Sequence, residues 1–197
     1  MAATTLTTAT SQPVFSPRLQ GSTQASRSGI WVGIFAIIMS FAALTSSLLV
    51  RQGSGEWSHI VIPSLLYANT AALLLSSFTM EMARRALAKS AGPSVWLTVT
   101  LVLGLSFVGG QYLVWRQLAA RGLYLASNPN SSFLYVFTGV HALHLLGGIA
   151  MLVYLLAHVV VGGHTSLRRH RLDNTAIYWH FMGGLWLYLL FVISTRL

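Results

Sequence analysis

The side chains of this sequence that could carry chemistry inside a membrane are three histidines and a glutamate. His141 and His144 lie in one long apolar run, and at a spacing of three residues they share a helical face. His180 lies in the last apolar run, and Glu81 lies near the end of an earlier one. Imidazole and carboxylate are ordinary ligands of iron, copper and zinc, and ionisable groups within a membrane often relay protons. These residues therefore suggest either a metal site or a network of polar contacts.

The expected depths of the histidines argue against a shared metal site. At about 1.5 Å per residue, His144 lies roughly 16–18 Å from the outer end of its expected helix, whereas His180 lies roughly 8 Å from the inner end of its own. In a hydrocarbon core about 30 Å thick these depths differ by about one turn, and His141 lies about 4.5 Å further away. We therefore expect the four residues to form a structural polar network, because buried polar groups in lipid need partners.

Glu81 has two sets of expected partners. His180 lies at a similar depth, so a direct or water-bridged hydrogen bond between the two is geometrically feasible. Arg84 and Arg85 follow Glu81 by three and four residues, the spacings at which helical side chains pair, and this pairing is the favoured interpretation. A functional alternative for Glu81 is a site for protons or lipid headgroups.

The composition shows that these residues belong to a membrane protein. Of the 197 residues, 54% are hydrophobic and only 8% are charged, which excludes an ordinary water-soluble domain. The chain has no cysteine, so disulfides, thiolate metal sites and cysteine nucleophiles are excluded. The formal net charge of +9 comes from basic residues that flank apolar runs, as membrane orientation requires, and does not indicate binding to nucleic acid.

The apolar runs predict an all-α integral membrane protein with five transmembrane helices in a bundle. Residues 1–28, rich in Thr, Ser, Ala, Gln and Pro, predict a flexible cytoplasmic tail, and residues 29–197 form the transmembrane domain. The first apolar run begins too far from the N-terminus, and is too long, for a cleaved signal peptide. The expected spans are about 29–50, 60–82, 95–115, 132–161 and 175–195.

The distribution of basic residues predicts the orientation. With five spans, the tail and two loops on its side carry eight Lys and Arg residues, whereas the opposite side carries four. The positive-inside rule then places the N-terminus in the cytoplasm and the C-terminus outside.

Three further sets of residues have expected roles. Small residues at three- and four-residue spacing predict close packing of the first helix against another helix, of this chain or of a partner. Basic residues at inner span ends predict contacts with anionic lipid headgroups. Aromatic residues near span ends, Trp115, Tyr178 and Trp179 among them, are typical of a membrane-interface belt. The packing candidates are Gly29, Gly33, Ala36 and Ser40, and the headgroup candidates are Arg84, Arg85, Arg168 and Arg169.

Two segments resemble the last two helices of subunit III of the haem-copper respiratory oxidases. They are TGVHALHLLGG, from Thr138 to Gly148, and YWHFMGGLW, from Tyr178 to Trp186. The resemblance extends to NTAALLLSSFTMEMARRAL, from Asn69 to Leu87, and to the region of Gln111, Trp115 and Gly122. It implies a short, five-helix bacterial type of the cytochrome c oxidase subunit III family.

This resemblance implies a non-catalytic subunit of a terminal oxidase in aerobic respiration, in the bacterial inner membrane. The family role is assembly, lipid binding and sustained proton uptake by subunit I. Haem and copper are expected in the partner subunits I and II, not in this chain, for which no catalytic, cofactor-binding or metal-binding residue is expected. Subunit I is the expected direct partner, phospholipid is an expected ligand, and a larger respiratory supercomplex is a further expected assembly. Cytochrome c is the expected electron donor rather than quinol.

The sequence departs from the family pattern at two acidic positions. Many relatives carry a Ser-Glu pair on the first of these helices, where this chain has Ser40 and Phe41. The family's Trp-His-Phe-x-Asp pattern on the last helix ends here in Gly183. A proton-relay role that depends on those two acids is therefore not carried over to this chain.

Two alternatives remain open at this point. One is an accessory subunit of a nitric oxide reductase, which shares the general helix pattern. The other belongs to a different class, an independent histidine-rich membrane metalloprotein or transporter that uses the same three histidines and Glu81.

Overall fold

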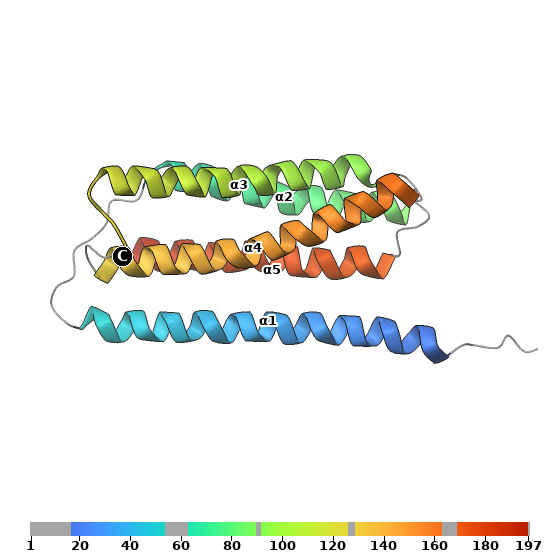
Figure 1. Ribbon diagram of the computed structural model, residues 1–197, viewed down its shortest axis with the longest axis horizontal. Coiled ribbons are helices and arrows are strands. Elements are labelled where there is room, and N and C mark those ends of the chain that lie inside the picture. The colour runs from blue at the N-terminus through green and yellow to red at the C-terminus, as the bar shows by residue number, and fades with distance from the viewer. Residues whose placement is uncertain (1–16, 54–62, 90–91, 126–128, 163–168, 197) are drawn as a thin grey trace, which may run out of the picture.

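The computed structural model describes residues 17–53, 63–89, 92–125, 129–162 and 169–196. These residues form five helices and no strand, which confirms the all-α fold (Figure 1). The helices are α1 (Pro17–Gln52), α2 (Leu65–Ala88), α3 (Ser94–Ala120), α4 (Pro129–Gly162) and α5 (Arg169–Arg196).

Helix α1 begins before the span expected from hydropathy. Residues 17–28, expected to be part of a flexible tail, are helical, and the helix opens at Pro17. Proline suits the first helical turn because its fixed φ fits a helix and its missing N–H would have no intrahelical partner there. The apolar portion long enough to cross a membrane is Arg27–Gln52, close to the expected span. Hydropathy detects the part of a helix that faces lipid, not its polar extension. The expectation for residues 1–16 lies outside the described residues.

Helix α2 is displaced toward the C-terminus relative to the expected span of 60–82. It begins at Leu65, just after Pro63, whose carbonyl accepts the N–H of Leu66 at 3.0 Å. Proline is tolerated at a helix start and disfavoured in the interior, which explains why the regular helix does not extend through Pro63. The helix continues to Ala88 and so carries the charged residues of its last two turns.

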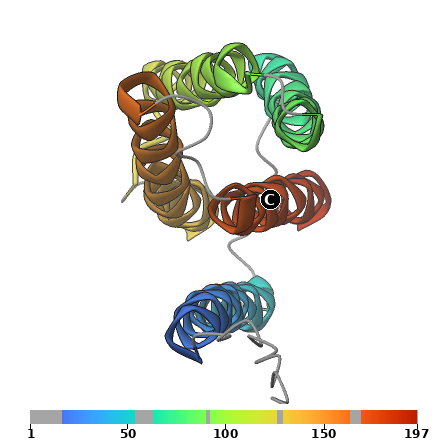
Figure 2. The ribbon, with the colours of Figure 1, turned by 90° about the vertical axis from the view of Figure 1, so that its right-hand side faces the viewer.

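Four of the described helices, α1, α3, α4 and α5, are long and apolar enough to cross a membrane. Helix α2 lies alongside them, packed against α3 and α5. Helices α2 and α3 are antiparallel: the hydroxyls of Thr79 and Thr100 lie 2.8 Å apart, and Asn69, which is earlier on α2, packs against Gly110, which is later on α3. Viewed end-on, α2 to α5 surround a common interior, and α1 lies outside this bundle, below α5 (Figure 2).

Two tryptophans of α5 fill the interior of the α2–α5 bundle. Trp179 donates its Nε1–H to Ser76 Oγ at 3.1 Å, and Trp186 donates its own to Thr70 Oγ1 at 3.0 Å. Both side chains are buried. The assignment of Trp179 to an interfacial belt was therefore wrong. Its indole packs inside the bundle in a notch formed by Gly104 and Gly148, where an added Cβ would lie 2.8 Å and 3.2 Å from the ring, and it has a hydroxyl partner there.

Helix α1 is attached to the bundle along one face. Ile37, Phe41 and Leu48 are buried against the bundle. Two polar contacts add to this: the Thr45 hydroxyl lies 2.9 Å from that of Tyr188, and Gln52 Nε2 donates to the carbonyl of Arg196 at 2.7 Å. The opposite face of α1 is exposed.

Candidate functional site

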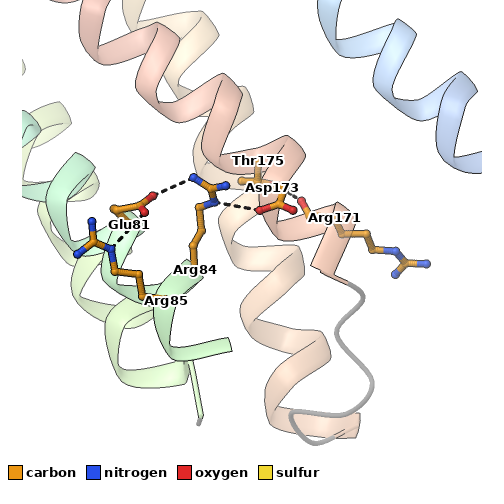
Figure 3. A network of polar contacts seen from close by, with 6 residues as sticks. All are labelled: Glu81, Arg84, Arg85, Arg171, Asp173 and Thr175. Atoms are coloured by element: carbon orange, nitrogen blue, oxygen red, sulfur yellow. Dashed lines mark hydrogen bonds and ion pairs between the residues drawn. The ribbon is translucent and has the colours of Figure 1, made fainter. Parts of the chain in front are cut away.

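The charged residues at one end of the bundle form a network between α2 and α5 (Figure 3). Arg84 donates through Nη1 to Glu81 Oε2 at 2.9 Å and through Nε to Asp173 Oδ1 at 2.9 Å. Arg85 donates to the other oxygen of Glu81 at 3.3 Å. The expected pairing of Glu81 with the two arginines is therefore confirmed. Arg84 in addition ties the end of α2 to the beginning of α5.

The two arginines of this network differ in exposure and in the number of carboxylates that they contact. Burial disfavours the charged form of Arg84, but the hydrogen bond and charge of Asp173, followed by those of Glu81, raise the pKa of its guanidinium above the usual value. The Arg84 side chain is 39% exposed and is shared between two carboxylates, whereas that of Arg85 is 65% exposed. Arg169 is also exposed near this end, and Arg168 lies outside the described residues.

Asp173 is an ion-pair partner of Arg84 that the spacing of residues in the sequence does not predict. It lies 89 residues from Arg84 in the chain, so no helical spacing links the two. A signal was nevertheless present, because the whole sequence contains only three acidic residues against twelve Lys and Arg. An acid in such a basic membrane protein is a strong candidate for an ion pair.

The structure places the expected polar residues in separate surroundings. His144 Nδ1 lies 2.7 Å from the carbonyl of Val140, and the carbonyl of His144 accepts the Tyr178 hydroxyl at 2.8 Å. His141 is fully buried, whereas His180 is only partly buried. In the described part of the chain, the carboxylate of Glu81 bonds to arginines and no hydrogen-bonded network joins it to the histidines.

The arrangement of potential metal ligands agrees with this separation. Among the described residues, no group of three or more His, Cys, Asp or Glu side chains is placed so that it could hold a metal ion.

The small residues of α1 lie on its outward face. Gly29, Gly33, Ala36 and Ser40 are all exposed. Nothing in the described structure lies within 4 Å of a Cβ built at Gly29 or Gly33. The Ser40 hydroxyl donates to the carbonyl of Ala36 at 2.9 Å, within its own helix. The described part of this chain therefore supplies no helix that packs against this stripe.

The two positions at which the resemblance implies an acidic residue, Phe41 and Gly183, are both buried. Phe41 is fully buried, with ring centroids 6.3 Å from Phe137 and 6.1 Å from His144. Gly183 is buried on α5, and a Cβ there would lie 3.2 Å from the Ser77 hydroxyl. At the first position, where the resemblance implies a carboxylate, this chain has an aromatic contact between α1 and α4.

Comparison with known proteins gives one family across almost the whole chain. The family model described as cytochrome c oxidase subunit III matches residues 21–195. The probable cytochrome c oxidase subunit 3 of Nocardia farcinica (strain IFM 10152) is 32% identical over 165 residues, covering 80% of each chain. That of Mycobacterium leprae (strain TN) is 30% identical over 171 residues, covering 84% of this chain and 85% of the relative. The cytochrome bo(3) ubiquinol oxidase subunit 3 of Pseudomonas aeruginosa (strain PAO1) is 30% identical over 165 residues, covering 81% and 79%.

Proposed function

Because this chain belongs to the cytochrome c oxidase subunit III family, a subunit of haem-copper oxidases, we propose that it is the supporting membrane subunit of an oxygen-reducing oxidase that accepts electrons from cytochrome c. The observation that carries this proposal is the family match, which spans residues 21–195 and therefore most or all of each of the five described helices. Relatives with similar identity are named as cytochrome c oxidases and as quinol oxidases, so the donor is the part of the proposal that most needs a direct test.

The proposed role is assembly and durability of the complex rather than catalysis. The chain presents broad apolar surfaces: Trp31, Val32 and Phe35 on α1 are between 57% and 69% exposed, and similar residues lie outward on the other helices. Such surfaces suit lipid and neighbouring transmembrane helices. We propose that this chain contacts subunit I directly and that subunit II belongs to the same complex. Haem and copper are bound by those two partners.

The ion-pair end of the bundle is proposed as the cytoplasmic end. Arg85 and Arg169 are exposed there and suit anionic phospholipid headgroups, whereas Arg84 is shared between two carboxylates. The N-terminus is then cytoplasmic and the C-terminus lies outside, in a bacterial inner membrane. A reporter that is active only outside the cytoplasm should work after Leu197 and fail within 163–168, and the reverse pattern would contradict this orientation.

Copurification tests the assignment. The tagged chain, extracted in a mild detergent from its own membranes, should bring down partner subunits with a haem spectrum and with copper, in a complex that oxidises reduced cytochrome c and consumes oxygen. Oxidation of quinol instead of cytochrome c would show that quinol is the electron donor, and it would leave the proposed role as an oxidase subunit unchanged. A partner that reduces nitric oxide and not oxygen would support the reductase alternative.

Deletion of the gene tests the supporting role. The remaining oxidase should begin turnover at a normal rate and lose activity faster than the intact complex during continued turnover. An oxidase that is unchanged in rate, durability and yield would contradict the proposal.

The metal content of the chain gives a further test. The purified chain alone should hold no stoichiometric metal by elemental analysis. One tightly bound iron, copper or zinc that is lost in His144→Phe would favour the metalloprotein alternative.

A further inference from the structure

Three polar side chains in the interior of the α2–α5 bundle have hydrogen-bonding atoms without a partner in the described structure. Asn69 on α2 is 6% exposed, Gln111 on α3 is 2% exposed and His141 on α4 is fully buried. The atoms concerned are Asn69 Nδ2, Gln111 Nε2 and Oε1, and His141 Nδ1 and Nε2. Buried polar atoms are nearly always paired with protein or ordered water, so this group requires an explanation.

Packing between α2 and α3 places the first two side chains at one level. A Cβ on Gly110 would collide with the side-chain amide of Asn69, so the two helices meet directly at this pair. Gln111 is the next residue along α3 and is buried. Asn69 and Gln111 therefore differ by about one residue in level, or about 1.5 Å along the bundle.

A second helix contact places His141 at the same level. Trp115 on α3 donates its Nε1–H to Thr138 Oγ1 on α4 at 3.0 Å. Gln111 precedes Trp115 by four residues, and His141 follows Thr138 by three. Because α3 and α4 run in opposite directions, both steps lead the same way along the bundle, over about 6 Å and about 4.5 Å. Three unpaired polar side chains from three helices thus share one layer of the interior.

Aromatic side chains enclose this layer. The His141 ring lies 6.0 Å from the ring of Phe107 and 5.1 Å from that of Trp186, measured between centroids. Phe107 and Trp186 also contact each other, at 4.8 Å. The polar N–H of Trp186 is occupied by Thr70, the neighbour of Asn69 on α2. The aromatic surroundings offer these atoms no hydrogen-bond partner. The three polar side chains must therefore form hydrogen bonds with one another or with a small bound molecule.

The chemistry of the unpaired atoms selects the bound molecule. The amide nitrogens of Asn69 and Gln111 offer only N–H donors, which repel a cation, whereas Gln111 Oε1 and one nitrogen of a neutral histidine offer acceptors. An anion would need a compensating charge, and the enclosing Phe107, Trp186 and Thr70 are uncharged. Water donates and accepts at once and typically makes about three hydrogen bonds in buried sites.

We propose that Asn69, Gln111 and His141 form a buried water-binding site at which ordered water bridges α2, α3 and α4. The water satisfies the polar atoms of all three helices and fixes their relative positions in this layer. The site is independent of the proposed oxidase role, because it rests on the packing of the bundle itself.

A density map of the wild-type complex tests the site without any substitution. At a resolution that shows ordered water, a cryo-electron microscopy map should contain a peak within hydrogen-bonding distance of Gln111 and at least one of the other two side chains. Side chains that bond directly to one another, with no peak between them, would overturn the proposal.

Water contact in lipid gives an independent test on the full chain. With histidine ring nitrogens labelled with ¹⁵N, solid-state NMR should show magnetisation transfer from water to a ring nitrogen of His141, identified by the signal lost in His141→Phe. The transfer should be lost in Asn69→Ala/Gln111→Leu and kept in Gln117→Leu, which alters an exposed glutamine of the same helix. A His141 signal that receives nothing from water in the wild type, or is unchanged in the double variant, would refute the site.

Discussion

The α2–α5 bundle and helix α1 are held in place in different ways. The bundle is cross-linked through its interior by hydroxyl and indole contacts, such as Trp179 with Ser76 and Thr79 with Thr100. Helix α1 contacts the bundle along one apolar face, with Thr45 and Gln52 as polar contacts to α5. Its opposite face bears small residues that no described part of the chain covers. The interior of the bundle is thus filled by side chains of its own helices, whereas one face of α1 is left uncovered by the described part of the chain.

The largest expected effect on stability comes from filling the notch that holds Trp179. A Cβ on Gly104 would lie 2.8 Å from Cη2 of Trp179, whose indole is rigid and held by Ser76. Gly104→Val should destabilise the chain by about 3 kcal/mol, in the upper part of the range for overpacked interiors. The measurement is thermal unfolding of the purified chain in detergent, followed by circular dichroism.

The control for this prediction lies on the same helix. Gly109 has nothing within 4 Å of an added Cβ, so Gly109→Val meets only lipid or detergent. Its unfolding temperature should stay within a few degrees of the wild type. Equal losses in the two variants would show that helical propensity, not the notch, sets the effect.

The next effect in size concerns the acceptor of the Trp179 indole. Ser76→Ala leaves the Nε1–H of Trp179 buried without its partner, which should cost about 1–3 kcal/mol. Ser106→Ala is the matched control, because both hydroxyls bond to a carbonyl three residues earlier, but Ser106 is exposed. Unfolding temperatures that fall by the same amount in both variants would mean that the contact between α2 and α5 adds little.

A smaller effect is expected for the ion pair between the same two helices. Side-chain exposures of 39% for Arg84 and 35% for Asp173 place the pair among partly solvated ones, for which about 0–1 kcal/mol is typical. A double-mutant cycle with Arg84→Gln and Asp173→Asn should give a coupling energy in this range that falls as salt is raised. A coupling of several kcal/mol that is insensitive to salt would place the pair in a desolvated environment instead.

The sequence predicts this molecule well where the relevant contacts are local. The five apolar runs correspond to the five helices of the described residues. Glu81 pairs with Arg84 and Arg85 because spacings of three and four residues bring side chains together on any helix. The ends of the helices are predicted less accurately, because hydropathy does not show that α1 continues through polar sequence back to Pro17. The positions of membrane-facing apolar residues are thus better predicted than the ends of the helices that carry them.

Contacts between distant helices could not be predicted in the same way. Asp173 meets Arg84, and Trp179 enters the bundle, only because particular faces of α2 and α5 are turned toward each other. Helical spacing shows that His141 and His144 share a broad face, but it does not show that one is enclosed by aromatic rings while the other bonds to its own helix. Such distinctions depend on the rotation of each helix about its axis.

Gly33→Leu is expected to have the smallest effect on the stability of the chain. It is also the most direct test of the difference between the bundle and α1. Because nothing lies within 4 Å of the added Cβ, the unfolding free energy should change by no more than about 0.5 kcal/mol. If α1 is the helix that docks on subunit I, the larger side chain holds the two backbones apart and weakens retention of this chain in the purified complex.

The control is Gly109→Leu. Position 109 is as open in this chain as position 33 but lies on α3, so this substitution should leave retention unchanged. Retention lost only in Gly109→Leu would move the docking surface to α3, and retention kept in both would place it on neither helix. Because both variants are expected to fold, the retained fraction measures the interface and not the stability of the subunit.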